Sequence, residues 1–382
     1  MKRVFLVMKE DLVFFPPVLS LLNILPTIGY KVIHIGVYSD EISKKLYESK
    51  GILFMPTNKY HGDSNLIKKF LDQCVFKTKV EKYLNNANLT DNDFVWILQS
   101  ETVCLLHDLV GKYKSILHFF ENVEPQMNWK YRLMSIRYNP ENTMKKAHKI
   151  VCCEYNRAQI IKGLFQLDSL PIVLPNKLVA DESCLINPPS TIKEIVNKLS
   201  LKVKNKKVIL YQGIFLDKER RLEEFCEAIN HLPDEYVLIA MGGGSNLYEE
   251  LKEKYESDRI LFIPFINPPY HLLVTKMADI GILSYFPRKG SYSHTLNPLY
   301  CAPNKIFEYA KYSIPMISND VPALKYTYME YGCGECVTYP VTAEKISNKI
   351  VMIFNNIDKY KENAMNYYNS VDIKNIVNEI LS

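Results

Sequence analysis

The sequence lacks any long uninterrupted apolar run, and its cysteines are too scattered for a disulfide framework. No window of the chain approaches the roughly 18 apolar residues that a membrane-spanning helix needs. The first apolar run, Met1–Met8, meets Lys9, Glu10 and Asp11 at once. It is therefore shorter than a signal-peptide core and predicts a buried strand. Nine cysteines, an odd number, favour a reducing compartment, so we expect a cytoplasmic protein.

Several motifs of hydrolases and metalloenzymes are also missing. The chain has neither Gly-x-Ser-x-Gly nor His-Glu-x-x-His, so serine hydrolase and zinc protease chemistry have no support. Cys333 and Cys336 have the spacing of a metal or redox pair, but no second Cys-x-x-Cys exists to complete a zinc site. The stretch 91–93 reads Asp-Asn-Asp, yet it directly precedes a strand-like run and predicts a turn. Neither stretch predicts a metal site, and no motif in the sequence predicts a cofactor.

Length and composition predict two soluble domains. A chain of 382 residues with 47% hydrophobic and 23% charged residues is long enough for two cores and has the balance of a globular protein. The net charge is uneven, because residues 1–180 carry 24 basic against 17 acidic residues, a net +7, whereas residues 181–382 carry a net −2. The basic half is most simply a solvated face. It could also meet an anionic membrane or a phosphate-bearing acceptor, and we expect no nucleic-acid partner.

Short apolar runs alternate with amphipathic ones throughout the chain, in a β-α-β rhythm. Strands are predicted near residues 4–8, 32–37, 52–55, 94–98, 116–120, 150–153, 207–211, 236–241, 260–263, 280–284 and 316–318. Helices are predicted near residues 18–28, 42–46, 103–110, 127–147, 221–230, 246–255 and 304–311. The rhythm predicts an α/β protein of two Rossmann-like, doubly wound parallel-sheet domains that face each other across a cleft.

The domain boundary is predicted in the turn-rich segment that follows Pro171 and Pro175. We place the domains at residues 1–180 and 181–358. The last stretch, 359–382, has helical character and no strand after it, which leaves it free to cross back to the first domain.

The segment 302–320 is the most informative. Pro303 suits the first turn of a helix, so a helix is expected to begin there with free amides that attract phosphate. Asn304 and Lys305 stand at the same end, and Glu308, one turn later, offers a carboxylate to sugar or ribose hydroxyls. Taken alone, the segment also fits an ordinary helix with Glu308 in solvent.

The order of motifs decides between these alternatives. The segment 303–309 resembles the Pro-Asn/Ser-Lys-x-Phe-Glu-Tyr motif of family 4 glycosyltransferases, and residues 210–213, 220–225, 236–244 and 277–282 resemble four further elements of that family in the same order. The resemblance implies the GT-B fold and a retaining, metal-independent, hexosyltransferase-like enzyme of bacterial surface-polysaccharide synthesis. Residues 1–180 would then bind the acceptor and residues 181–358 the nucleotide-sugar donor.

The resemblance also assigns roles to individual residues. Arg220 is implied to neutralise the leaving diphosphate, and Gly213 to let the chain approach the phosphates. Glu308 is implied to bind the ribose, while Phe265 and Ile266 lie where the family reads the base through its backbone. Gly242 and Gly244 belong to a glycine-rich run after a strand, which predicts a turn facing phosphate; position 247 is leucine, so the dinucleotide fingerprint is incomplete.

Three positions depart from the family pattern. Tyr300 stands where the family usually has a second glutamate, Ile214 replaces an arginine and Ser313 replaces a glycine. We hypothesise that Lys305 supplies the charge lost at Ile214, which makes it a catalytic candidate beside Arg220.

The N-terminal half resembles the family less. Residues 117–121 resemble a strand that ends in a histidine-glutamate pair, and residues 172–176 resemble its interdomain element. Glu121 is therefore the acceptor-side catalytic candidate, although a carboxylate there can equally cap a helix. The apolar residues 12–15 can contact a lipid-like acceptor or simply pack.

The expected activity is transfer of a sugar, with retention, from a nucleotide-diphosphate-sugar to a hydroxyl of a glycan or lipid-linked acceptor. An epimerase or a phosphorylase on the same fold is an alternative, and an inactive nucleotide-sugar-binding protein is another. The cytoplasm is the expected location, with peripheral contact at the inner face of the membrane through the basic half.

Overall fold

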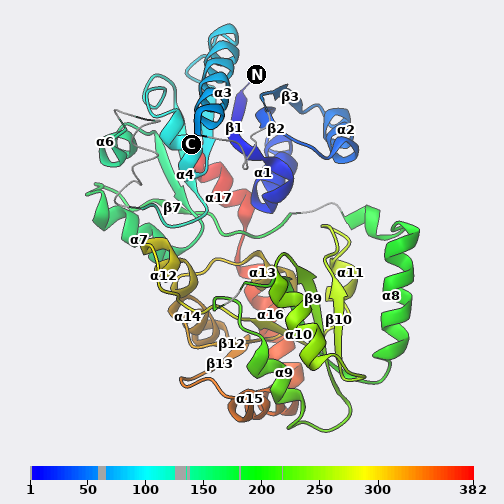
Figure 1. Cartoon of the computed structure of the whole chain (residues 1–382). Helices are drawn as coiled ribbons and strands as arrows, with labels where there is room; N and C mark the ends of the chain where they lie inside the picture. Colours follow the sequence, from blue (N-terminus) through cyan, green and yellow to red (C-terminus); the bar gives the residue numbers. More distant parts are fainter. Residues whose placement is uncertain (1, 59–65, 125–134, 136–137, 180–181, 217) are drawn as a thin grey trace. The chain divides into compact units, whose positions relative to one another are not determined.

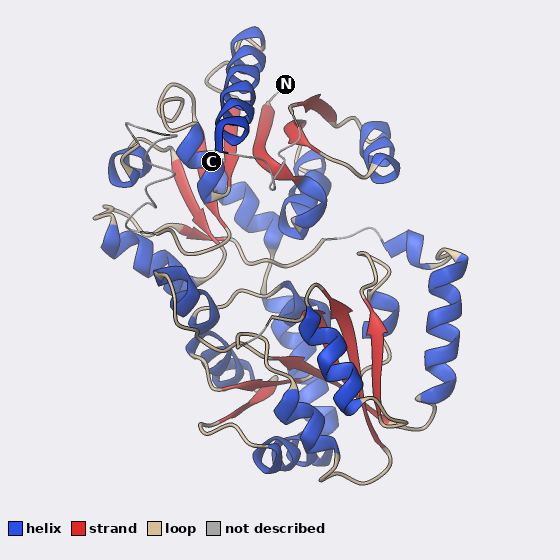
Figure 2. Cartoon of the chain, in the orientation of Figure 1, coloured by secondary structure: helices blue, strands red, loops and turns tan. Residues whose placement is uncertain are grey.

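The computed structural model describes residues 2–58, 66–124, 135, 138–179, 182–216 and 218–382. The chain forms two compact units, one of residues 1–179 with 372–382 and the other of residues 180–371. Each unit is a parallel sheet with helices packed on both faces (Figures 1 and 2). Among the described helices, none is both long and apolar enough to cross a bilayer.

The first unit is built on a seven-stranded sheet of order β3-β2-β1-β4-β5-β6-β7, with every pair parallel. The strands are β1 (Arg3–Asp11), β2 (Lys31–Val37), β3 (Leu53–Pro56), β4 (Phe94–Leu98), β5 (Ser115–Phe119), β6 (Lys149–Cys152) and β7 (Ile172–Val173). All five residues of β4 and of β5 are buried, as expected for strands covered on both faces.

Helices connect these strands. They are η1 (Leu12–Phe14), α1 (Pro16–Thr27), α2 (Glu41–Ser49), α3 (Leu66–Asn86), α4 (Ser100–Leu105), α6 (Pro140–Lys145), α7 (Tyr155–Leu164) and α17 (Ile373–Ile380). α3 packs through Phe76, Val80 and Leu84 into the core on one side of the sheet. This 21-residue helix was not predicted from the sequence. Of the helix predicted at 127–147, residues 127–134, 136 and 137 lie outside the described residues, and within the described part only α6 is formed.

The second unit is built on a six-stranded parallel sheet of order β10-β9-β8-β11-β12-β13. The strands are β8 (Lys207–Ile214), β9 (Tyr236–Gly243), β10 (Ile260–Pro264), β11 (Ile280–Leu283), β12 (Met316–Asn319) and β13 (Gly334–Val337). The chain order reverses at β8, whose neighbours are β9 on one side and β11 on the other. In open α/β sheets the ligand crevice lies at the carboxyl ends of the strands beside such a reversal.

The helices of the second unit cover both faces of this sheet. They are η2 (Glu182–Leu185), α8 (Ser190–Lys202), α9 (Glu223–Ile229), α10 (Asn246–Tyr255), α11 (Leu272–Thr275), α12 (Tyr292–Leu299), α13 (Asn304–Lys311), α14 (Pro322–Tyr331), α15 (Ala343–Asn355) and α16 (Ile357–Ser370). α13 and α16 help to bury one face of the sheet and α9 and α15 the other. The predicted fold class, two doubly wound parallel α/β domains, is confirmed.

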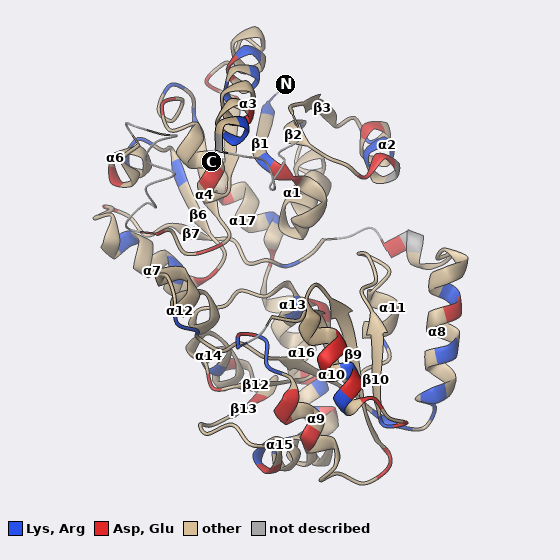
Figure 3. Cartoon of the chain, viewed as in Figure 1, with Lys and Arg blue, Asp and Glu red and all other residues tan. Residues whose placement is uncertain are grey.

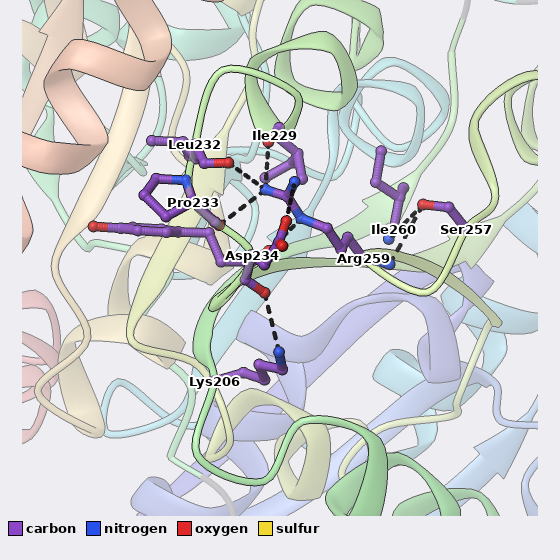
Figure 4. Close-up of polar contacts among 9 residues, drawn as sticks. Lys206, Ile229, Leu232, Pro233, Asp234, Ser257, Arg259 and Ile260 are labelled. Atoms are coloured by element: carbon purple, nitrogen blue, oxygen red, sulfur yellow. Dashed lines mark hydrogen bonds and ion pairs between the residues drawn. The ribbon is translucent and has the colours of Figure 1, made fainter.

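Arg259 stabilises the edge of this sheet that lies opposite the crevice (Figure 4). Its guanidinium donates to the backbone carbonyls of Ile229 at 2.6 Å, Leu232 at 2.7 Å and Pro233 at 3.0 Å, and pairs with Asp234 at 3.2 Å. The Ile229 carbonyl is the last of α9, and those of Leu232 and Pro233 follow the helix. The Ile229 and Pro233 carbonyls each accept one further hydrogen bond from a backbone amide. One side chain therefore ties the end of α9 to the start of β10.

Some predicted boundaries differ from the structure. The single helical stretch predicted over 359–382 is wrong, because α16 ends at Ser370 and α17 begins at Ile373. Asp372 starts the new helix by accepting a hydrogen bond from the Asn375 amide at 3.1 Å. The break divides the stretch between the two units. The turn predicted at 91–93 is confirmed, since Asp93 accepts from the Thr90 amide at 2.8 Å.

Candidate functional site

The helix that carries the predicted phosphate site begins at Asn304, with Pro303 as its N-cap rather than its first helical residue. Pro303 is extended there, with φ −73° and ψ 137°, as is usual for a cap. No side chain caps this end of α13. The first amides of the helix therefore keep their hydrogen-bonding capacity for another acceptor.

Lys305 lies against the end of β8. Its Nζ is 5.1 Å from the centroid of the Tyr211 ring, and a Cβ built on Gly213 would lie only 2.1 Å from that nitrogen. Among the described residues, none accepts a hydrogen bond from the half-buried Lys305 ammonium. Burial, with a smaller contribution from Arg220, lowers the pKa of Lys305 to about 7. The site therefore holds a cation whose charge lacks a close counter-ion.

Arg220 lies in the loop between β8 and α9, not at the start of a helix, because α9 begins only at Glu223. Its Nη1 is 3.0 Å from Glu219 Oε1, and its guanidinium carbon is 3.8 Å from the centroid of the Tyr285 ring. Glu219 is buried and also pairs with Arg288 Nε at 3.0 Å. One carboxylate thus holds two arginines from different loops.

Glu308 is buried in a hydrogen-bonded network rather than exposed to solvent. Gln212 Nε2 donates to one carboxylate oxygen at 2.6 Å, and His271 Nε2 lies 3.3 Å from the other. Thr275 in turn donates to Gln212 Oε1 at 2.7 Å. Burial by itself would raise the pKa of Glu308, but His271, Lys305 and Gln212 together hold it below its usual range. The carboxylate therefore stays ionised.

The three glycines singled out in the sequence serve close backbone packing. Gly213 has φ +142°, and any side chain there would collide with Lys305. A Cβ on Gly242, which has φ +158°, would lie 1.8 Å from the Gly213 carbonyl oxygen. Gly242 is within β9, which runs through Gly243, so the turn predicted for this run is wrong there; only Gly244, with φ +102°, lies in the turn before α10. The glycines allow β8, β9 and Lys305 to approach one another.

The remaining candidate residues differ in their exposure to solvent. Phe265, just after β10, is 59% exposed, whereas Ile266 is buried in the core of the unit. Asn304 is half-buried at the first position of α13. Glu121 belongs to the other unit, where it is exposed shortly after β5. The structure therefore brings together Arg220, Lys305, Gly213 and Glu308 at one sheet edge, in a single unit.

Four polar residues of this cluster were not among the candidates predicted from the sequence. Gln212 and His271 bind Glu308, while Glu219 and Arg288 form the second group. In the sequence, only Glu219 and Gln212 could have been found, because they are adjacent to the predicted site residues Arg220 and Gly213. His271 and Arg288 lie in other loops, and only the fold brings them to the end of β8.

The three positions that depart from the family pattern lie in different local environments. Ile214 is 57% exposed at the last position of β8, and its carbonyl accepts from the Tyr211 hydroxyl at 2.7 Å. Tyr300 is half-buried at the C-cap of α12. Ser313 has φ +56° after α13, a left-handed conformation that favours glycine. Cys333 and Cys336 are free thiols, and the described residues contain no group of three metal-ligating side chains.

Comparisons with known proteins identify the fold of the chain. No family model matches the chain, and no curated protein sequence is similar to it. HepE from Anabaena, solved in complex with UDP, matches with a TM-score of 0.68 at 14% identity, covering 100% of this chain and 98% of that chain. The chain has the GT-B fold.

Other GT-B-like matches differ in their described activities. A glycosyltransferase from Rickettsia africae ESF-5 matches with a TM-score of 0.68 at 15% identity, covering 99% of this chain and 96% of that chain. A putative UDP-N-acetylglucosamine 2-epimerase from Listeria monocytogenes matches with a TM-score of 0.61 at 11% identity, covering 95% and 90%. Identities this low establish the fold, and the activity must be argued from the site.

Proposed function

We propose that the protein is a glycosyltransferase that takes a sugar from a nucleotide-diphosphate-sugar bound in the second unit. The observation that carries the proposal is the pair of cations at the end of β8. Arg220 and Lys305 are close enough for Arg220 to depress the pKa of Lys305, and the lysine donates to no described acceptor. Two cations held together at the uncapped start of a helix are suited to a diphosphate.

The same two cations would stabilise the nucleoside diphosphate as it leaves. Breaking the glycosidic bond leaves negative charge on the β-phosphate, and preorganised cations stabilise that charge without reorganising. The ion pair with Glu219 and the stack on Tyr285 fix the Arg220 guanidinium in advance. We infer that Arg220 and Lys305 act on the leaving group, with Gly213 giving room for the phosphates.

Glu308 is the proposed ribose ligand. Each of its oxygens is engaged by Gln212 or His271, but a carboxylate oxygen can accept a second hydrogen bond. Its ionised state, held by these neighbours, suits it to accept from two adjacent hydroxyls. Phe265 and Ile266, after the edge strand β10, are proposed to lie beside the base, and Asn304, Gly242 and Gly244 to border the phosphates.

Donor binding is tested by thermal unfolding with UDP-, GDP-, ADP- and CMP-sugars, starting with UDP-glucose because HepE has been solved with it. A donor at about a hundred times its dissociation constant stabilises the protein by ~2.7 kcal/mol. Arg220→Ala should abolish the shift, and Lys305→Ala should weaken it. If none of the nucleotide-sugars raises the unfolding temperature of the wild-type protein, the proposal fails.

The stereochemical course and the acceptor rest on the family resemblance. We infer retention, no metal requirement and a glycan or lipid-linked acceptor, with Glu121 on the acceptor side. The anomeric configuration of the first-formed product, followed by NMR, tests retention, and undiminished turnover in EDTA tests metal independence. A cytoplasmic location and a role in surface-polysaccharide synthesis remain part of this proposal.

A second candidate function is epimerisation of a nucleotide-sugar, which the similarity to the Listeria structure favours. An epimerase converts its donor without an acceptor, whereas a transferase consumes it only slowly by hydrolysis. Incubation of the donor alone, with separation of the sugar epimers, distinguishes the two. Donor binding without transfer, hydrolysis or epimerisation would instead indicate a silent nucleotide-sugar-binding protein.

A further inference from the structure

The solvent side of helix α3 in the first unit carries an unusual row of apolar side chains. Ile67 is 72% exposed, Phe70 45%, Leu71 54% and Val75 44%, and Cys74 is also exposed. These positions follow the spacing i, i+3, i+4, i+7 and i+8, so they share one face of the helix. We call these five residues the α3 stripe.

The α3 stripe is not the face that holds the helix on its domain. Gln73, Phe76, Val80 and Leu84 are the buried residues of α3, and they point to the opposite side. The buried apolar residues Phe76, Val80 and Leu84 thus begin where the stripe ends, and in the first half of the helix the apolar face is the exposed one. Scattered exposed apolar residues need no explanation, but a contiguous row on one helix face marks an interaction site.

Lysines flank the α3 stripe. The sequence of α3 contains five lysines against two acidic residues, and Figure 3 marks basic residues along this helix in blue. Lys77 is paired with Asp108 at 2.6 Å. Helical geometry places Lys68 and Lys79 beside the stripe, between it and the packed face, and Lys82 in line with the stripe two turns beyond Val75. Apolar side chains bordered by lysines are the pattern of a helix that lies in the interface of an anionic bilayer.

We propose that the α3 stripe docks the first unit on an anionic lipid surface. A second copy of the chain is a poorer occupant, because a two-fold contact through the stripe would bring together two helices that each carry five lysines against two acidic residues. Anionic headgroups would instead neutralise the lysines while the apolar side chains enter the acyl boundary. The surface belongs to the first unit and uses no donor-site residue, so it stands independently of the proposed transferase activity.

The test is co-sedimentation of the full chain with vesicles of phosphatidylcholine alone or mixed with phosphatidylglycerol. We expect binding to the mixed vesicles that weakens as salt is raised, and little binding to phosphatidylcholine. Ile67→Ser with Leu71→Ser should lower the partition coefficient at least tenfold. Lys79→Gln with Lys82→Gln should lower it less and flatten the salt dependence.

A matched control separates the α3 stripe from general surface apolarity. Ile186→Ser with Leu201→Ser removes an isoleucine and a leucine that are each 77% exposed in the second unit, and it should leave binding unchanged. Equal binding by the wild type and the Ile67/Leu71 variant would overturn the proposal. So would light scattering that shows a wild-type dimer dissolved by the same substitutions. The UDP-glucose thermal shift, measured on every variant, reports donor binding separately.

Discussion

Replacing Lys305 by methionine should stabilise the protein while it weakens donor binding. Methionine has a similar length and no charge, so it removes the ammonium that burial and Arg220 disfavour. A fall in pKa from 10.5 to about 7 corresponds to roughly 5 kcal/mol for a fully shielded ammonium, at about 1.4 kcal/mol per pKa unit. Lys305 is half-buried and solvent screens it, so we expect a gain of only ~1–2 kcal/mol at pH 6.

The gain in stability from Lys305→Met should become smaller as the pH rises. In the unfolded chain the lysine keeps its proton up to about pH 10.5, whereas in the folded protein it loses the proton above about pH 7. The unfolded state binds more protons between these values, so the wild type gains stability as the pH rises through that window. The advantage of Lys305→Met should therefore be largest at pH 6 and shrink towards pH 9.

Thermal unfolding at pH 6 and pH 9, with and without UDP-glucose, measures both effects. For a unit of this size, 1–2 kcal/mol corresponds to a rise in Tm of about 2–8 °C. Exposed Lys359 on α16 supplies the control, since Lys359→Met should change neither stability nor donor response. A variant that is less stable than the wild type at pH 6, or that keeps a full donor-induced shift, would refute the assignment of Lys305 as an uncompensated phosphate-binding cation.

Four further predictions follow from single contacts. Gly242→Ala should cost at least ~3 kcal/mol in chemical unfolding, because its Cβ would collide with the Gly213 carbonyl rather than with a flexible side chain; a loss below 1 kcal/mol would contradict the close packing of β8 and β9. Ser313→Gly should raise stability by ~1 kcal/mol in the same assay, because glycine adopts the left-handed conformation at no cost. Arg259→Met should lose ~1–3 kcal/mol, since it removes the donor of the Leu232 carbonyl and one of the two donors of the Ile229 and Pro233 carbonyls, whereas removing its exposed partner through Asp234→Asn should cost less than 1 kcal/mol. Glu219→Gln should keep the fold but raise the dissociation constant for UDP-glucose several-fold by loosening Arg220, and an unchanged constant in calorimetry would exclude that positioning role.

Local patterns in the sequence were sufficient for five of the six strands of the second unit, but its helices α8, α12, α14 and α15 were not predicted. Helices α10 and α13 and strand β4 of the first unit have the predicted bounds, because their apolar spacing and flanking turns agree. By contrast, α3 escaped prediction because its apolar residues lie on one face in the first half of the helix and on the opposite face in the second half, so no single apolar stripe runs along it.

Motif order likewise predicted where Arg220, Lys305 and Glu308 would meet, because the ends of β8 and the start of α13 lie at one edge of a doubly wound sheet. The burial, ionisation and hydrogen-bond partners of those residues could not be predicted. The network of Gln212, Thr275 and His271 around Glu308 joins β8, α11 and α13, which are far apart in sequence. The pairing of Glu219 with both Arg220 and Arg288 also depends on the meeting of two loops.

The sequence by itself therefore determined the α/β class and the two-domain plan, since these depend on periodicity along the chain, and the resemblance of its motifs to a known family indicated the candidate donor residues. Only the tertiary structure decided which of them are buried, which cation lacks a partner and which carboxylate is held ionised. Burial and electrostatic coupling depend on distances through space between residues that are remote in the chain. The lowered pKa of Lys305 and the exposed face of α3 are properties of that kind.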